Sequence, residues 1–159
     1  MTDGNPITPA GMAALRARYD QLMHTDRPAI VEVVRWAAGN GDRSENGDYL
    51  YGRKRLREID RELGHLAKRM AAARVIDPAR QTERDRALFG CTVTIADDDD
   101  NERTLTLVGD DEQDVAQGHI GWSAPIARAL RGARVGDVRV VRLPGGEKNW
   151  EVVAIRWPA

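Results

Sequence analysis

Two helical patterns on either side of a glycine-rich segment constrain the fold of this chain more than any other feature. The second pattern is the more regular, because its apolar residues recur at alternating steps of three and four without a slip. Its members are Tyr49, Gly52, Leu56, Ile59, Leu63, Leu66, Met70 and Ala73. A stripe of this kind lines one face of a helix and needs a second helix to cover it.

The earlier pattern follows Thr8, which can cap a helix that has Pro9 at its first position. Its apolar members are Met12, Leu15, Tyr19, Leu22, Ile30, Val33 and Ala37. Two helices with matching seams are expected to pair as an antiparallel coiled coil. Pro28 interrupts the first helix, which must either kink there or end near Asp26 and restart. Because the stripe resumes in phase at Ile30, the kink is favoured.

The segment GNGDRSENGD, residues 39–48, separates the two helices and predicts a tight turn. Each helical arm then has about 30 residues, or roughly 45 Å at 1.5 Å per residue. The first half of the chain is therefore expected to be a long helical hairpin with this turn at its tip.

The pattern changes from helical to alternating after Pro78. Residues 79–86 are polar and are predicted to form a linker, and the alternating segments that follow predict strands. These segments cover residues 91–96, 104–108, 119–122, 137–143 and 150–157. Ser123 is expected to cap a short helix that has Pro125 in its first turn and Gly132 at its end.

The predicted fold class is α+β. Residues 1–78 form a coiled-coil hairpin with its acidic tip near 40–48, residues 79–86 form the linker, and residues 87–159 form an antiparallel sheet domain with one short helix. The acidic run Asp97–Asp100 is expected to be a solvated loop between two strands, and residues 144–149 a second turn.

Cysteine and histidine usage excludes several classes of site. Cys91 is the single cysteine, so it forms no internal disulfide and is expected to be a small buried hydrophobe. The three histidines are scattered and lack the spacing of a zinc site. The tryptophans are interpreted as packing residues. They are Trp36, Trp122, Trp150 and Trp157.

Charge and hydropathy point to a soluble protein of the cytoplasm. The net charge of -1 gives no global attraction to nucleic acid or to a membrane. No apolar run approaches the roughly 20 residues that span a bilayer, and the first residues lack a basic-then-apolar signal.

Two carboxylates, Asp42 and Glu45, lie three residues apart in the predicted tip. Such a pair can approach one Mg²⁺, which prefers oxygen ligands and often takes only one or two from a protein. Two carboxylates alone make a weak metal site, so catalysis would need ligands from another protein. The same spacing also fits helix capping, in which Ser44 or Asp42 caps the second helix.

A basic cluster follows the tip on the second helix. It consists of Arg53, Lys54, Arg55 and Arg57. The cluster can bind phosphates with an affinity that falls as salt is added. The alternative is a solvated helix face on which neighbours such as Arg57 and Asp60 offset one another.

One segment matches a known pattern. Residues 36–60, WAAGNGDRSENGDYLYGRKRLREID, resemble the Gre family of bacterial transcript cleavage factors, and GDRSEN with the following RKRLREID resembles its GreB type. Further matching segments are, in order, ITPAGMAALRARYDQL, DRPAIVEVV, VGDDE, SAPIARAL and PGGEKNWEV. The resemblance covers nearly the whole chain.

This resemblance implies a fold and a mechanism. In the family, a C-terminal domain of FKBP-like topology docks at the secondary channel of bacterial RNA polymerase. The N-terminal coiled coil passes down the channel, and its tip stimulates cleavage of the nascent RNA 3′ segment in backtracked complexes. By resemblance, Asp42 and Glu45 help polymerase residues hold a second Mg²⁺, and Ser44 supports them. The residues that match the RNA-contacting basic patch are Arg53, Lys54, Arg55 and Arg57.

The resemblance further implies a monomer that is no stand-alone enzyme and binds no metal tightly alone. Asn40, Gly47 and Gly52 depart from the family pattern. They are expected to loosen the tip, at about 1 kcal/mol for a glycine inside a helix. Two other functions fit the same sequence: a secondary-channel modulator without cleavage, and a coiled-coil adaptor with isomerase activity in its FKBP-like domain.

Overall fold

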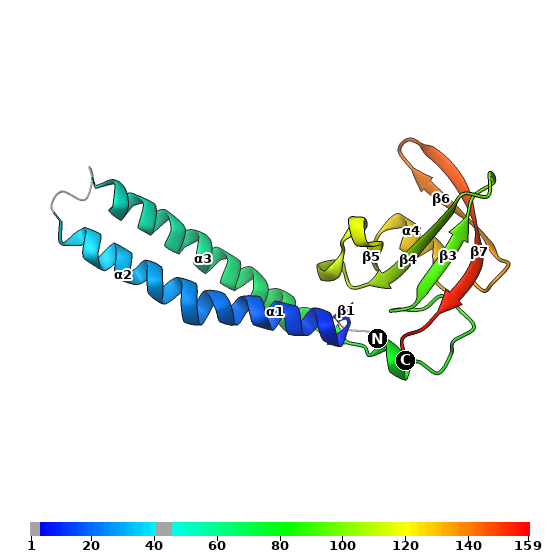
Figure 1. The fold of residues 1–159 in the computed structure, drawn as a ribbon, viewed down its shortest axis with the longest axis horizontal. Coiled ribbons are helices and arrows are strands. Elements are labelled where there is room, and N and C mark those ends of the chain that lie inside the picture. The colour runs from blue at the N-terminus through cyan, green and yellow to red at the C-terminus, as the bar shows by residue number, and fades with distance from the viewer. Residues whose placement is uncertain (1–3, 41–45) are drawn as a thin grey trace. The chain divides into compact units, whose positions relative to one another are not determined.

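The computed structural model describes residues 4–40 and 46–159, so Asp42, Ser44 and Glu45 lie outside the described residues (Figure 1). Contacts divide the chain into two compact units, each with its own hydrophobic core. One unit is Ala13–Ala72, and the other joins the N-terminal segment through Met12 to Ala73–Ala159. This division differs from the predicted boundary because the N-terminal segment clusters with the second half of the chain.

The helical unit contains two antiparallel arms (Figure 1). The first arm comprises α1 (Pro9–Gln21), a π turn (Leu22–Asp26) and α2 (Arg27–Ala38), and the second arm is α3 (Gly47–Ala72). Thr8 caps α1 as predicted, since its Oγ1 accepts a hydrogen bond of 3.0 Å from the N–H of Gly11.

Pro28 neither ends nor restarts the first arm. The N–H of Arg27 donates to the carbonyl of Leu22, and Asp26 and Arg27 both keep helical backbone angles. Pro28 occupies the second position of α2, where a missing backbone donor costs little. The interruption predicted at this point is therefore a π turn inside a continuous helix.

The seam between the arms is apolar, as the heptad stripe predicts. Its buried members are Leu22, Ile30, Ile59, Leu63 and Leu66, with Leu15, Tyr19, Met23 and Leu56 packed against them. Ion pairs flank the seam on the surface, where Arg18 meets Glu62 at 2.8 Å and Arg27 meets Asp60 at 2.8 Å. The helical hairpin thus has one narrow core, bounded by charges that join its two arms.

Gly52 marks a close approach of the two arms. It is buried, and a Cβ atom added to it would lie 2.8 Å from Cγ2 of Val34. From the sequence, this glycine is expected to loosen the tip. The structure shows that glycine is needed here for close packing of the arms, because the β-branched Val34 occupies the space that a larger residue would need.

The second unit is a five-stranded sheet with one short helix, which confirms the α+β class (Figure 1). Its elements are β3 (Thr92–Ala96), β4 (Glu102–Val108), β5 (His119–Gly121), α4 (Pro125–Leu130), β6 (Val138–Leu143) and β7 (Gly146–Arg156). The strand order is β5-β4-β3-β7-β6, antiparallel except for the β4–β5 pair. Cys91 lies fully buried in the core, where burial raises the pKa of its thiol to about 11.

Two local predictions in this unit are wrong. Ser123 does not cap α4, because the cap position is Ala124 and the Ser123 N–H donates to Asp110 instead. The turn predicted over residues 144–149 is shorter, since Leu143 already pairs with Gly146 and the rest belongs to β7. Gly132, by contrast, has a positive φ of 77° after α4, as expected of a helix-ending glycine.

A small parallel sheet ties the N-terminal segment to the second unit. It pairs β1 (Asn5–Ile7) with β2 (Ala73–Val75).

The Glu112 carboxylate accepts hydrogen bonds from the N–H and hydroxyl of Thr8 and from the N–H of Gly109. Single 3₁₀ turns complete the unit at Pro78–Arg80, Asp110–Glu112 and Val115–Gln117. Glu112 therefore holds Thr8, the residue before α1, against the loop at Gly109.

Asp97 also departs from the predicted solvated loop. Only 7% of the residue is exposed, and its carboxylate accepts hydrogen bonds from the N–H groups of Asp99 and Asn101. The Nζ of Lys148 lies 3.0 Å from Oδ2. These donors, with the Asn101 N–H first, lower the pKa of Asp97 to about 2. Asp98, Asp99 and Asp100 are exposed, as expected.

Replacing two glycines of α3 with alanine is expected to have different effects. Gly64 is exposed with no atom within 4 Å of an added Cβ, so Gly64→Ala should stabilise the protein by about 1 kcal/mol. Gly52→Ala should give no such gain, because the new methyl group meets Val34. Thermal unfolding of both variants measures this difference. In a Val34→Ala background, Gly52→Ala should stabilise the protein as Gly64→Ala does. Equal gains at both sites while Val34 is present would contradict the close approach.

The Asp97 contacts predict a pH-dependent contribution to stability. A carboxyl group whose folded pKa is depressed stabilises the fold above its unfolded pKa, about 3.9, and loses this effect as the pH falls through the folded value. We therefore expect Asp97→Asn to lower the melting temperature at pH 7, and the gap to the native protein to shrink from pH 4 to pH 2. Asp98→Asn is the control at an exposed neighbour. A difference in melting temperature that stays constant over this range would contradict a stabilising, ionised Asp97.

Candidate functional site

The candidate acids of the tip, Asp42 and Glu45, lie outside the described residues together with Ser44. The residues on both sides of the tip are described. The first arm ends at Ala38 with Gly39 as its cap, and the second arm begins at Gly47. The candidate acids therefore belong to a short connection at one end of the hairpin.

Asn46 caps the second arm and joins it to the first. Its Oδ1 accepts a hydrogen bond of 3.1 Å from the N–H of Tyr49, and its Nδ2 donates to the carbonyl of Ala37 at 2.6 Å. Asn46 thus occupies a cap position of α3. The alternative in which Asp42 or Ser44 caps this helix falls on residues outside the described ranges. Sequence reasoning missed Asn46, although an asparagine directly before the first helical residue is itself a capping signal.

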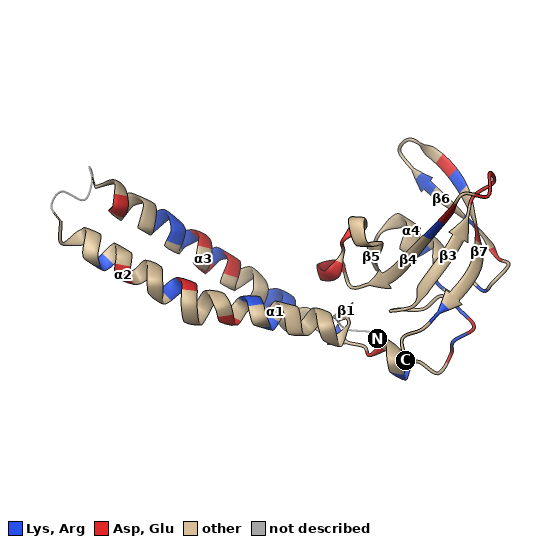
Figure 2. Cartoon of the chain, viewed as in Figure 1, with Lys and Arg blue, Asp and Glu red and all other residues tan. Residues whose placement is uncertain are grey.

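The basic patch of Arg53, Lys54, Arg55 and Arg57 lies on α3 close to the tip. Figure 2 shows basic residues gathered on this part of the helix. Arg53 donates a hydrogen bond of 2.8 Å to the hydroxyl of Tyr49, and its guanidinium lies 5.7 Å from the centre of that ring. Arg53, Lys54 and Arg57 are exposed, whereas Arg55 is half-buried. The patch thus presents its charges to solvent on a regular helix.

Two acids near the patch form ion pairs across the seam. Asp60 pairs with Arg27, and Glu62 pairs with Arg18, whose hydrogen bond lowers the pKa of Glu62. Within the described ranges, no member of the basic patch forms an ion pair with a carboxylate. The pairing of Arg57 with Asp60 is therefore not found among the described residues. Of the patch, Arg55 lies close enough to Glu62 for its charge to help lower the pKa of that carboxyl.

Large apolar side chains are exposed close to the same end of the hairpin. Trp36 and Tyr51 are each 63% exposed, and Leu50 and Val33 are 51% and 38% exposed. The expectation that Trp36 is a packing residue is wrong, because it lies outside the seam. The expectation is confirmed for Trp150, which is buried, and for Trp122 and Trp157, which pack against the core of the sheet unit.

The sheet unit carries a separate cavity of about 490 Å³. Apolar side chains from α4, β6 and β7 line it, including Ile126, Val141, Leu143 and Trp150. Trp150 is the one aromatic side chain among the lining residues. Pockets for peptide side chains usually combine several aromatic rings with a few placed polar groups, so this lining gives little support to an isomerase.

Two kinds of feature are absent from the part of the chain that the structure describes. Residues 4–40 and 46–159 hold no cluster of three or more side chains able to bind a metal ion. The helices in these ranges also include none that is long and apolar enough to cross a membrane.

Both halves of the chain match models of known families. Residues 5–75 match the model "Transcription elongation factor, N-terminal", and residues 81–156 match "Transcription elongation factor, GreA/GreB, C-term". Transcription elongation factor GreB of Neisseria meningitidis serogroup B is 50% identical over 153 residues, which cover 96% of this chain and 94% of that protein. The GreB of Pseudomonas aeruginosa is 43% identical over 158 residues, covering 99% of this chain and 94% of that protein.

Solved structures give a further match. The transcription elongation factor GreA/GreB from Nitrosomonas europaea is 18% identical and has a TM-score of 0.42, covering 98% of this chain and 99% of that chain.

Proposed function

Since this chain belongs to the GreA/GreB family of transcription elongation factors, we propose that it stimulates cleavage of the extruded RNA 3′ segment in backtracked RNA polymerase. The helical hairpin enters the secondary channel of the polymerase, and the end that carries Asp42 and Glu45 reaches the active centre. One observation carries the proposal above the others. The two arms pair along a single apolar seam and leave their connection at the end of a thin rod.

The dimensions of the hairpin support this role. The second arm has 26 residues, which corresponds to about 39 Å at 1.5 Å per residue. Two paired helices are slender, and the ion pairs of Arg18 and Arg27 brace them on the surface. A rod of this kind delivers two side chains to a site deep inside a larger enzyme.

The tip supplies an incomplete set of ligands. Asp42 and Glu45 offer the hard carboxylate oxygens that Mg²⁺ prefers, and polymerase carboxylates complete the set. When bound there, Mg²⁺ stabilises the charge on the attacking and leaving oxygens. In the hydrolysis, the water oxygen bonds to phosphorus and the water loses a proton. The bond from phosphorus to the 3′ oxygen breaks and that oxygen takes a proton, which leaves a 3′ hydroxyl on the retained RNA and a 5′ phosphate on the released segment. Asp42 and Glu45 orient the water, and Ser44 supports them. The protein is thus no stand-alone enzyme.

The basic patch handles the RNA that the polymerase has extruded. Arg53, Lys54, Arg55 and Arg57 contact phosphates, which hold the strand in place without reading its sequence. One copy of the chain serves one polymerase, and the work takes place in the bacterial cytoplasm, where transcription occurs.

Neutralising either tip carboxylate is expected to abolish stimulated cleavage and to leave polymerase binding intact. We expect Asp42→Asn or Glu45→Gln to slow cleavage by at least about a hundredfold, the usual effect of removing one preorganised electrostatic group. Cleavage is followed in a purified backtracked complex with Mg²⁺, and binding is measured separately. Asp48→Asn, an exposed acid in the first turn of α3, is the matched control and should cleave normally.

Two results would contradict this mechanism. A parallel loss of binding would mean that the tip acids are structural. Binding without any cleavage by the native protein would instead identify a modulator of the secondary channel that lacks cleavage activity.

Removing charge from the basic patch is expected to matter most for long extruded RNA. The triple variant with alanine at Arg53, Lys54 and Arg55 should cleave long segments more slowly, because three cations no longer hold the phosphates of the strand. The slope of log rate against log salt should also flatten by roughly 0.7 for each phosphate that is no longer neutralised. Lys68→Ala, an exposed cation further along α3, is the control. Equal cleavage by native and variant protein at every RNA length would contradict the assignment.

A further inference from the structure

A groove lies on one face of the helical hairpin, between α2 and α3. Its volume is about 230 Å³, and its walls include Ala29 and Val33 from α2 and Tyr51 and Arg55 from α3. Ile30 of the seam also lines it, and Asp26 adds one carboxylate. We call this the Tyr51 groove. It lies within the helical unit and near the end that carries the tip.

The folding of the hairpin alone does not explain why a tyrosine stands at position 51. The heptad stripe uses Tyr49 at the seam, whereas Tyr51 lies outside the stripe and is 63% exposed. Val33 faces the same groove, and Trp36 lies three residues further along α2, on the neighbouring turn of the same side. Exposed large apolar side chains that gather in one place mark a binding surface more often than single scattered ones do.

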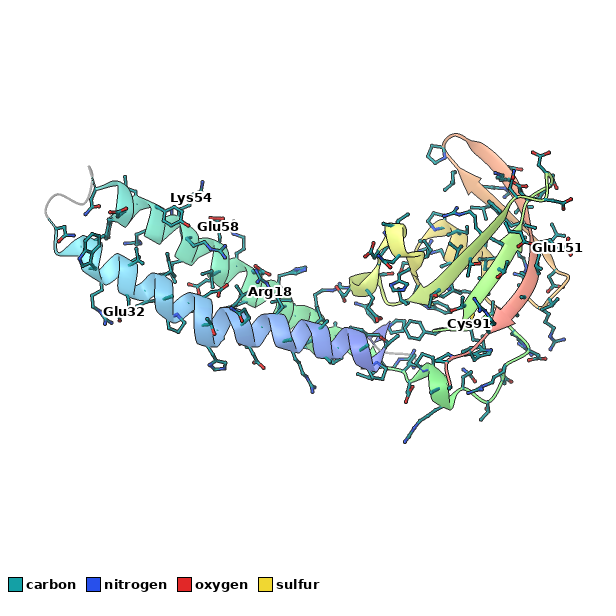
Figure 3. The ribbon with its side chains drawn as sticks, viewed as in Figure 1. Arg18, Glu32, Lys54, Glu58, Cys91 and Glu151 are labelled. Carbon is teal, nitrogen blue, oxygen red and sulfur yellow. The ribbon has the colours of Figure 1, made fainter. Side chains whose placement is uncertain are left out.

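The charges at the groove favour a polyanion. Arg55 lines it, and the rest of the basic patch lies on the adjacent turns of α3. Figure 3 shows Lys54 and Glu58, four residues apart, on the side of α3 away from α2. The acid of the groove, Asp26, already accepts a hydrogen bond of 2.9 Å from Nε2 of Gln21. An aromatic ring beside a cation, with further cations on the adjacent turns of the same helix, is the kind of surface by which proteins hold single-stranded nucleic acid.

We propose that the Tyr51 groove binds one unpaired base of the extruded RNA, with the base stacked on the Tyr51 ring and Arg55 at the neighbouring phosphate. The proposal rests on the proposed function and names how the RNA is held. Extruded RNA has any sequence, so only contacts that every nucleotide can make are of use. Stacking on a ring and charge contacts to phosphate both meet that condition.

The test uses backtracked complexes assembled from synthetic RNA. The extruded 3′ nucleotides are unpaired, so a single abasic nucleotide can replace each of them in turn without changing the hybrid. Cleavage rates are measured for the native full-length chain and for Tyr51→Leu, Tyr51→Phe and Leu50→Ala. Leu50 is the matched control, because it is exposed and next to Tyr51 but does not line the groove.

At one position, the abasic nucleotide should slow cleavage by the native protein about tenfold, the scale of one stacked base. Tyr51→Leu should slow cleavage of the intact RNA equally and add nothing to the abasic effect, because both changes remove the same stacking interaction. Tyr51→Phe and Leu50→Ala should behave as native. Independent effects of the abasic nucleotide and of Tyr51→Leu would overturn the proposal. So would a loss of polymerase binding by Tyr51→Leu, which would show that the groove docks polymerase protein instead.

A second readout separates this proposal from the proposed function. RNA with 4-thiouridine at the sensitive position, or at each extruded position in turn, is irradiated in the complex and the linked peptide is mapped. A crosslink to the groove that Tyr51→Leu removes supports the proposal even if the native protein stimulates no cleavage. Crosslinks that never reach the groove overturn it even if cleavage is normal.

Discussion

The apolar seam between the two arms is the interaction on which the rest of the hairpin depends. A two-helix hairpin has no second layer, so Leu22, Ile59 and their neighbours provide all of its buried apolar contact. Residues of α3 that lie off the seam, such as Lys54 and Arg57, face solvent and can serve another purpose. Charged side chains and exposed aromatic rings off the seam are therefore compatible with a stable fold. The close approach of Gly52 to Val34 belongs to the packing between the two arms.

The proposed function places the chemistry in the complex with polymerase. In that proposal Asp42 and Glu45 supply two carboxylates, and the basic patch lies behind them on α3. Asn46 joins the two helices beside the tip. Such a design makes sense when the remaining ligands belong to a partner. In the proposed function, this chain supplies reach, position and charge to that complex.

Features with a regular period could be predicted from the sequence. The heptad stripe gave the paired arms, and alternation located the strands of the sheet. Contacts between distant residues could not be predicted, because no local pattern encodes them. Glu112 binds Thr8 across 104 positions, and β1 pairs with β2 through only three residues each. At the site, the basic patch was predicted, whereas the Asn46 cap and the exposure of Trp36 and Tyr51 were not, because periodicity describes the seam and not what lies beside it.

The most direct test is a cryo-electron microscopy structure of this protein bound to a backtracked RNA polymerase with extruded RNA and Mg²⁺. We predict that the hairpin lies in the secondary channel, with carboxylate oxygens of Asp42 or Glu45 at about 2.1 Å from a Mg²⁺ ion that polymerase residues also bind. A bound protein whose hairpin lies outside the channel, or whose tip acids stay far from the active centre, would contradict it.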